Sequence, residues 1–270
     1  MLRPTSRATR ASTHGVAGAL TALFPLLALT GCGSSSDENG GDDGPTPPAT
    51  AQAAPKDKGP LCVGKAGADG VHVLRGGGFR LPGGGGVQYA GATADGTSRT
   101  ATLSDGEKYE EGQKEQTVEP GQKLTVSGHV YTVRQICSYR VVLEPQDAQA
   151  KAALTAAPAS LEAKGGEADA GLCFSTAPSV LAAASEGFPA KGDTLQLVNN
   201  GGVSTFPTGL SLTASVDATA QTARIGANCA AIPVAIYEDV RAGDTVEFGH
   251  VLFKVTELTD DAVRLTRTSG

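Results

Sequence analysis

The chain has 270 residues, 36 of them glycine and 15 proline, and aromatic residues make up only 4%. Hydrophobic residues amount to 40%, which is enough for packed cores but not for a bundle of membrane-spanning helices. The formal net charge of -6 excludes the basic surface that nucleic-acid binding and peripheral binding to anionic lipid both require. The length predicts one or two domains.

The first 31 residues have the organisation of an export signal. Three arginines and no acidic residue precede an uncharged apolar segment at Gly15–Thr30. This segment is shorter than the about 20 residues that a spanning helix needs, and it is typical of the hydrophobic core of a signal peptide. We therefore expect residues 1–31 to be a signal peptide that is removed.

The apolar segment ends in Leu29-Thr30-Gly31-Cys32. This motif resembles the lipobox of bacterial lipoproteins, and its Ala- and Gly-rich setting is similar to actinobacterial lipoproteins of uncharacterised function. The resemblance implies lipidation of Cys32 by a diacylglyceryl group, cleavage before it, and anchoring at the extracytoplasmic face of the cell membrane. Two acyl chains are sufficient for stable anchoring. The alternative is an ordinary signal peptide with an unrelated cysteine.

Residues 32–60 have no apolar periodicity and few large apolar side chains. Such a segment cannot bury enough surface to offset its ordering entropy, so we predict a disordered tether. Its acidic run at 37–43 lacks the ligand spacing and closing Glu of an EF-hand, so solvated linker is the preferred interpretation.

Residues 118–143 and 240–265 have the same pattern, in which strands of period-two apolar alternation are separated by Gly-containing turns. The similarity extends upstream, where Asp95–Leu103 matches Asp217–Ile225. Further upstream, Phe79–Leu81 is matched to Leu195–Leu197, with a short insertion in the second copy. The repeats predict an internal duplication.

We therefore predict an all-β fold of two tandem small β-sandwich or barrel-like domains related by internal duplication. The first domain covers 61–145 and the second 171–270. Residues 146–170 join them, and their strong helix formers predict a short linking helix that ends near Pro158.

Four cysteines remain after Cys32, two in each copy. In an oxidising compartment we expect them to pair as disulfides, Cys62 with Cys137 and Cys173 with Cys229. A zinc site is the competing interpretation, but there is no Cys-x-x-Cys spacing and no cysteine lies near a histidine in sequence. A bridge between Cys62 and Cys173 would contradict the pairing within each copy.

His129 and His250 each follow a turn glycine and are interpreted as equivalent positions. A repeated histidine is a candidate for metal binding or acid–base chemistry. Neither copy supplies a repeated carboxylate nearby to orient the ring, so a partly exposed turn residue is the preferred interpretation. The glycine runs at 76–78 and 83–86 are interpreted as hairpin loops, because no Gly-Lys-Ser/Thr follows them.

An apolar segment of the second copy, Ala230–Asp239, aligns with an acid-rich stretch at Asp105–Glu119 in the first. This difference predicts that the apolar segment packs into an interface, against the first copy. Replacing Ile232 and Ile236 by serine would then expose or destabilise that contact.

No catalytic motif is present, and no cofactor or metal is expected from sequence. The preferred hypothesis is a lipid-anchored envelope protein that binds or scaffolds an unknown envelope protein or polymer, without catalysis and without nucleic acid. One alternative is an enzyme that modifies envelope polymers, with His129 or His250 as candidate residues. The other is a structural spacer. A concave site that joins a histidine to a carboxylate would separate these hypotheses.

Overall fold

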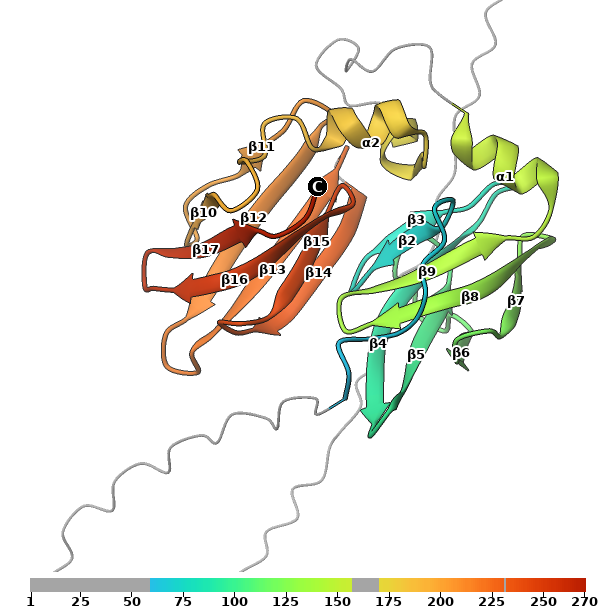
Figure 1. The fold of residues 1–270 in the computed structure, drawn as a ribbon, viewed down its shortest axis with the longest axis horizontal. Helices are drawn as coiled ribbons and strands as arrows, with labels where there is room; N and C mark the ends of the chain where they lie inside the picture. The colour runs from blue at the N-terminus through green and yellow to red at the C-terminus, as the bar shows by residue number, and fades with distance from the viewer. Residues whose placement is uncertain (1–58, 157–169, 231) are drawn as a thin grey trace, which may run out of the picture. The chain divides into compact units, whose positions relative to one another are not determined.

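A computed structural model describes residues 59–156, 170–230 and 232–270, all of which belong to one compact unit. The described chain is mostly β-strand, arranged in antiparallel sheets, so the predicted all-β class is confirmed (Figure 1). The predicted signal peptide, the lipidation site Cys32 and nearly all of the predicted tether lie outside the described residues. So does the second part of the predicted linker.

The first copy contains two antiparallel sheets. One has the order β3-β4-β5-β6, and the other has the order β1-β8-β9-β2 with β7 paired to β8. Apolar side chains from both sheets form one core, which includes Val73, Tyr89, Leu103, Tyr131 and Leu143. The strands are β1 (Cys62–Gly64), β2 (Val71–Leu74), β3 (Gly78–Arg80), β4 (Gly86–Asp95), β5 (Ser98–Asp105), β6 (Glu115–Val118), β7 (Lys123–Val126), β8 (His129–Cys137) and β9 (Arg140–Pro145).

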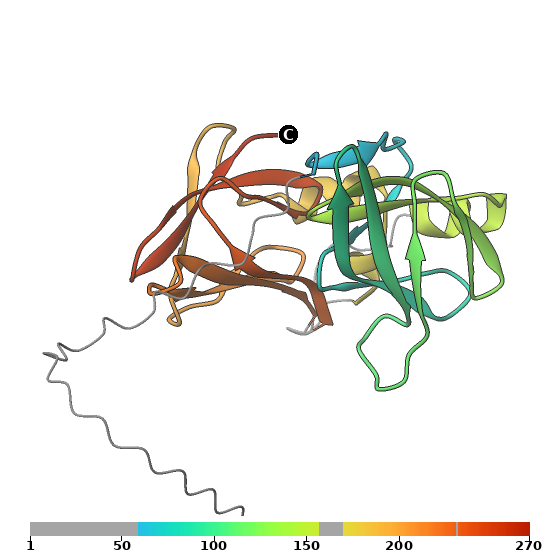
Figure 2. The same cartoon turned by 90° about the horizontal axis from the view of Figure 1, so that it is seen from below.

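The second copy repeats this arrangement. Its sheets have the orders β11-β12-β13-β14 and β10-β17-β16-β15, and its core includes Leu197, Leu212, Ile225, Phe253 and Leu265 (Figures 1 and 2). The strands are β10 (Thr194–Val198), β11 (Ser204–Thr205), β12 (Leu210–Asp217), β13 (Thr222–Cys229), β14 (Ile232–Val240), β15 (Thr245–Phe248), β16 (Val251–Leu258) and β17 (Ala262–Arg267).

Backbone hydrogen bonds repeat along with the strand order. The Gly121 amide donates to the Val133 carbonyl at 2.6 Å, and the Gly243 amide donates to the Val255 carbonyl at 2.7 Å. Both glycines have a positive φ, which a residue without a Cβ adopts without strain. The matched turns show that the two copies share one fold from the turn that precedes β7 and β15 to the last strand of each copy.

The predicted match further upstream is wrong. Leu195–Leu197 lies in β10, which pairs with the last strand of its copy. The strand that does this in the first copy is β2, so β10 corresponds to β2 and not to Phe79–Leu81. The turn after β3 confirms the shift, because Leu81 N donates to Gly85 O and Phe206 N donates to Leu210 O. Short alternating strands beside glycines resemble one another, and only their partners fix the register.

The predicted linking helix is present as α1 (Ala148–Thr155). Asp147 caps it, since its carboxylate accepts a hydrogen bond from the Ala150 amide at 2.7 Å. After residues 157–169, which are not described, the chain continues with a 3-10 turn, η1 (Ala170–Phe174), and the short helix α2 (Pro178–Ala184). Phe174 joins the core of the first copy, whereas Cys173 is bonded to Cys229 of the second, so this connection contacts both copies.

The structure pairs the four described cysteines as the sequence predicts. Cys62 and Cys137 face each other across β1 and β8, and Cys173 joins η1 to Cys229 at the end of β13. In the chain-entropy model, sequence separations of 75 and 56 residues correspond to a stabilisation of about 4 kcal/mol by each bridge. Cys62 and Cys173 are not equivalent, because one lies in a strand and the other in a 3-10 turn.

The two copies contribute side chains to each other's cores. Ile232 at the start of β14 belongs to the core of the first copy, whereas Tyr139 belongs to the core of the second. Val234 contacts both cores, and the Ile236 amide donates to the Arg75 carbonyl at 2.8 Å. The predicted interface of the apolar segment is therefore confirmed.

The glycines at 76–78 allow the backbones of the two copies to approach each other closely. A Cβ on Gly76 would lie 2.2 Å from the Ile236 carbonyl oxygen, and one on Gly77 would lie 2.1 Å from the Val234 carbonyl oxygen. Real Cβ atoms do not approach backbone this closely, so only glycine fits. These glycines serve backbone packing between the copies.

Candidate functional site

A cavity of about 80 Å³ lies where the two copies meet. The first copy, the second copy and the connection through η1 and α2 all contribute to its wall. Most of the wall is apolar, and one end carries His72, Glu247 and His250. The apolar lining includes Leu74, Phe79, Leu172, Val180, Leu181, Leu210 and Val234.

Strand alternation places His72 and Glu247 at the junction. Val71 and Val73 point into the core of the first copy, so His72 between them points outwards. Val246 and Phe248 point into the second core in the same way, and Glu247 faces away from it. Glu247 is nevertheless 0% exposed, because the other copy covers this face of β15.

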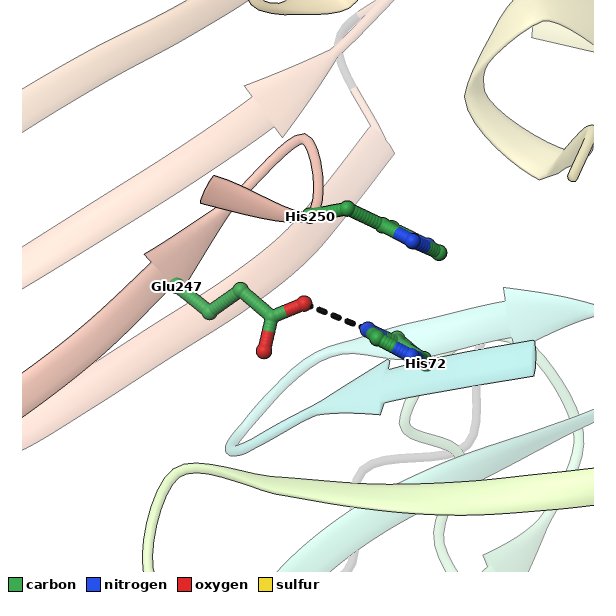
Figure 3. Close-up of side chains that lie close together, drawn as sticks. All are labelled: His72, Glu247 and His250. Carbon is green, nitrogen blue, oxygen red and sulfur yellow. Dashed lines mark hydrogen bonds and ion pairs between the residues drawn. The ribbon is translucent and has the colours of Figure 1, made fainter. Parts of the chain in front are cut away.

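A hairpin turn positions His250. Phe248 pairs with Val251, and the two residues between them, Gly249 and His250, have φ values of 54° and 62°. Two left-handed residues in succession are typical of the tight turns that join antiparallel strands. The turn holds the His250 ring parallel to the His72 ring, with ring centroids 3.8 Å apart and an interplanar angle of 3° (Figure 3).

The interpretation of His129 and His250 as equivalent is wrong. In the first copy the two left-handed turn residues are Ser127 and Gly128, and Val126 pairs with His129. His129 is thus the first residue of β8, whereas His250 is the second residue of its turn. The shared Gly-His dipeptide hides a shift of one residue, which changes the direction of the side chain.

Glu247 is held by two cationic or potentially cationic side chains. His72 Nδ1 lies 2.5 Å from Glu247 Oε1, and Arg140 Nη1 donates to Glu247 Oε2 at 2.7 Å (Figure 3). Burial alone would raise the pKa of Glu247. The charges of His72 and Arg140, together with the His72 hydrogen bond, outweigh burial and lower that pKa below its usual value. The site therefore holds an ionised carboxylate.

The backbone beneath Glu247 is also fixed. β15 is at the edge of its sheet, so one side of the strand has no neighbouring strand to pair with. Tyr237 supplies the partner: its hydroxyl accepts from the Glu247 amide at 3.2 Å and donates to the Glu247 carbonyl at 3.1 Å. Tyr237 thus fixes the backbone of Glu247, and the ion pairs hold its carboxylate.

His250 is held in its neutral form. Burial is the main cause, and the charge of His72 adds to it; the pKa of His250 is lowered to about 3. Glu247 acts in the opposite direction and Arg140 in the same direction. A neutral imidazole beside an ionised carboxylate offers a lone pair for a ligand at pH 7.

The shifted pKa predicts how stability depends on pH. Between pH 6.5 and 3 the unfolded chain protonates His250 and the folded chain does not, so the unfolded state binds more protons. Lowering the pH from 6.5 to 4.5 should therefore reduce the free energy of unfolding by about 2–3 kcal/mol through this residue. Glu247, whose pKa is also lowered in the folded chain, adds a further loss of stability as the pH falls.

Urea unfolding in EDTA at several pH values measures this effect. The control variant is His250→Asn, because asparagine tolerates the left-handed turn but does not titrate. Its stability should fall less steeply with acid than that of the wild type. Parallel pH profiles for the two proteins would contradict the buried neutral state of His250.

His129 lies in a different setting. Its Nδ1 is 3.1 Å from Asp147 Oδ2, and Asp147 also caps α1. The loop at 83–86 packs against this pair, since a Cβ on Gly83 would lie 2.9 Å from His129 Nε2. Each candidate histidine has a carboxylate beside it, contrary to the expectation, but only His250 borders the junction cavity.

Three groups of the junction were not identified from the sequence: His72, Glu247 and Arg140. None belongs to a motif, and they come from β2, β15 and β9. The one available signal is a charged residue in an otherwise apolar strand, since Glu247 stands between Val246 and Phe248. A charged side chain on one face of a strand usually points to solvent. This signal therefore identifies a buried site residue only when the packing of the two copies is known.

No family model, curated protein or solved structure matches the chain. Among the described residues, no helix is long and apolar enough to cross a membrane. The site is therefore interpreted from its own geometry.

Proposed function

We propose that the chain is a lipid-anchored protein of the extracytoplasmic face of the cell membrane that binds a small ligand without catalysis. The ligand site of this proposal is the junction cavity. The resemblance of Leu29-Thr30-Gly31-Cys32 to a lipobox supports the anchoring. The two disulfides indicate an oxidising environment, as expected outside the cytoplasm.

The observation that carries the binding function is a fully buried carboxylate in the wall of a mostly apolar cavity. Removing Glu247 from water is costly, and the chain uses two further side chains, His72 and Arg140, to keep the carboxylate ionised there. A structural spacer gains nothing from such an arrangement. A binding site gains fixed polar groups that orient a ligand within an apolar wall.

The size of the cavity restricts the ligand. A volume of about 80 Å³ accommodates a few waters, since each takes about 30 Å³ in the liquid. The ligand is accordingly an ion with its waters or a molecule of a few heavy atoms. A chain of an envelope polymer does not fit into this cavity.

Filling the cavity tests the proposed function. Leu181 lines the cavity and is only half-buried, so Leu181→Trp can place an indole there without a large backbone change. Small ions and fragment-sized molecules that raise the melting temperature of the wild type should have no effect on this variant. A ligand that stabilises both proteins equally binds elsewhere, and this result would contradict the proposed site.

The lipid anchor is tested separately. Cys32→Ala should move the protein from the membrane fraction to the soluble fraction and abolish incorporation of radiolabelled palmitate, because the thiol that carries the diacylglyceryl group is gone. Cys62 and Cys137 are already paired, so they do not substitute for it. Membrane association that survives the substitution would contradict lipid anchoring.

A further inference from the structure

We propose that His72, Glu247 and His250 together bind a divalent transition-metal ion, with Zn²⁺ the best fit, at the polar end of the junction cavity. The proposal rests on the proposed function, since it names the ligand of the same cavity. One nitrogen from each imidazole and one oxygen of Glu247 all lie within 4.8 Å of one another (Figure 3). In a tetrahedral zinc site the ligand atoms are about 3.3 Å apart. An imidazole binds a metal in the plane of its ring, so one of the two stacked rings must turn about its side-chain bonds to direct its nitrogen at the same ion.

The contacts of His72 show that its Nδ1 cannot make a suitable hydrogen bond to both of its neighbours. Its Nδ1 lies 2.5 Å from Glu247 Oε1 and 3.0 Å from Arg140 Nη1. A protonated Nδ1 serves the carboxylate but faces a guanidinium, which has only donors. An unprotonated Nδ1 can accept from Arg140, but its lone pair then faces the carboxylate oxygen. A cation coordinated by the imidazole and the carboxylate satisfies both lone pairs together.

His250 adds the third donor from the opposite side. Its ring lies face to face with that of His72, on a turn whose backbone is fixed by Gly249 and by the pairing of the flanking strands. The stacking brings a second imidazole nitrogen close to the Glu247 carboxylate, from the copy opposite His72. Imidazole nitrogen and carboxylate oxygen are both ligand atoms for zinc.

The donor types select the class of metal. Two imidazoles and one carboxylate suit zinc and its neighbours, whereas Ca²⁺ and Mg²⁺ need shells made mainly of oxygen. Three protein ligands leave a fourth position open towards the cavity, as in the His₂Glu sites of zinc enzymes. Arg140 neutralises the carboxylate, so the bound ion retains its full charge and attracts water or a small anion to the open position.

Titration of the full chain with ZnCl₂ tests the proposal. The protein carries Cys32→Ala for solubility, has no polyhistidine tag, and is freed of metal with EDTA before isothermal titration calorimetry at pH 7. We expect one Zn²⁺ per chain and no binding of Mg²⁺. His250→Asn and His72→Gln should each weaken binding by more than about 100-fold, which exceeds the usual effect of losing a second-shell partner.

The matched control is His129→Asn, which removes the other histidine that has a carboxylate partner. It should bind Zn²⁺ as the wild type does. His250→Asn retains the turn, and an unchanged circular dichroism spectrum verifies its fold. Absence of binding, or equal binding by the wild type and both junction variants, would overturn the metal site.

The two proposals fail in different ways. If Zn²⁺ does not bind but other small ligands stabilise the wild type and not Leu181→Trp, the cavity is a binding site and the metal proposal is wrong. If Zn²⁺ does not bind the wild type and no small ligand distinguishes the wild type from Leu181→Trp, both proposals are wrong. Binding of Zn²⁺ that depends on His72 and His250 supports both.

Discussion

Gly77→Val should destabilise the protein by more than about 3 kcal/mol, at the upper end of the cost of overpacking. A Cβ at this position would lie 2.1 Å from the Val234 carbonyl oxygen and 2.2 Å from the Val234 carbonyl carbon. Both are backbone atoms of β14, which cannot rotate away as a side chain can. The two copies must therefore separate, and the contacts of Ile232 and Val234 with the first core weaken as they do.

The control for this prediction is Gly91→Val. Gly91 lies in β4, has no positive φ, and nothing lies within 4 Å of a Cβ added there. The same substitution should cost less than about 1 kcal/mol at this position, since surface changes usually have small effects. Urea unfolding of both variants measures the difference. Equal losses at the two glycines would show that β14 does not pack on residues 76–78.

Glu247→Gln should cost about 3–5 kcal/mol, which is typical of breaking a buried ion pair from one side. The substitution retains the shape of the side chain but leaves Arg140 and His72 without their counter-charge. Those two side chains are only 12% and 11% exposed, so water cannot replace the carboxylate. Chemical unfolding at pH 7 in EDTA measures the loss.

Two further variants test the cause of this effect. The double variant Glu247→Leu, Arg140→Leu should be more stable than Glu247→Gln, because an apolar pair leaves no buried charge uncompensated. Glu257→Gln removes a carboxylate from a pair of similar length with Arg264, in which both side chains are nearly half exposed. It should cost less than about 1 kcal/mol. A similar cost for Glu257→Gln and Glu247→Gln would contradict the burial of the junction charges.

The sequence predicts the strands better than the junction between the copies. Alternation around Glu247 correctly assigns β15 and places the glutamate on its outer face. Whether that face meets water depends on the first copy, which no local pattern encodes. The apolar character of Ile232 and its neighbours did indicate an interface, because the aligned residues of the first copy are polar. Composition thus identified one side of the contact and not the charged residues within it.

The incorrect matches between positions of the two copies have a common physical origin. His129 and His250 share a dipeptide, but the turn in one copy is Ser127-Gly128 and in the other Gly249-His250. The turn residues are set by which residues pair across the hairpin, and a shift of one position reverses the side-chain direction. The cysteines were predicted correctly because an oxidising compartment and an even count predict that all four pair, and two of them fall in each predicted domain.

The central claim is that the two copies form a single body with one site at their junction, and differential scanning calorimetry of the full chain tests it most directly. The shared cores and the buried charges predict one transition whose calorimetric and van't Hoff enthalpies agree. Gly77→Val should divide that transition in two, because it separates the copies and leaves most of each core intact. Two independent transitions in the wild type would contradict the claim.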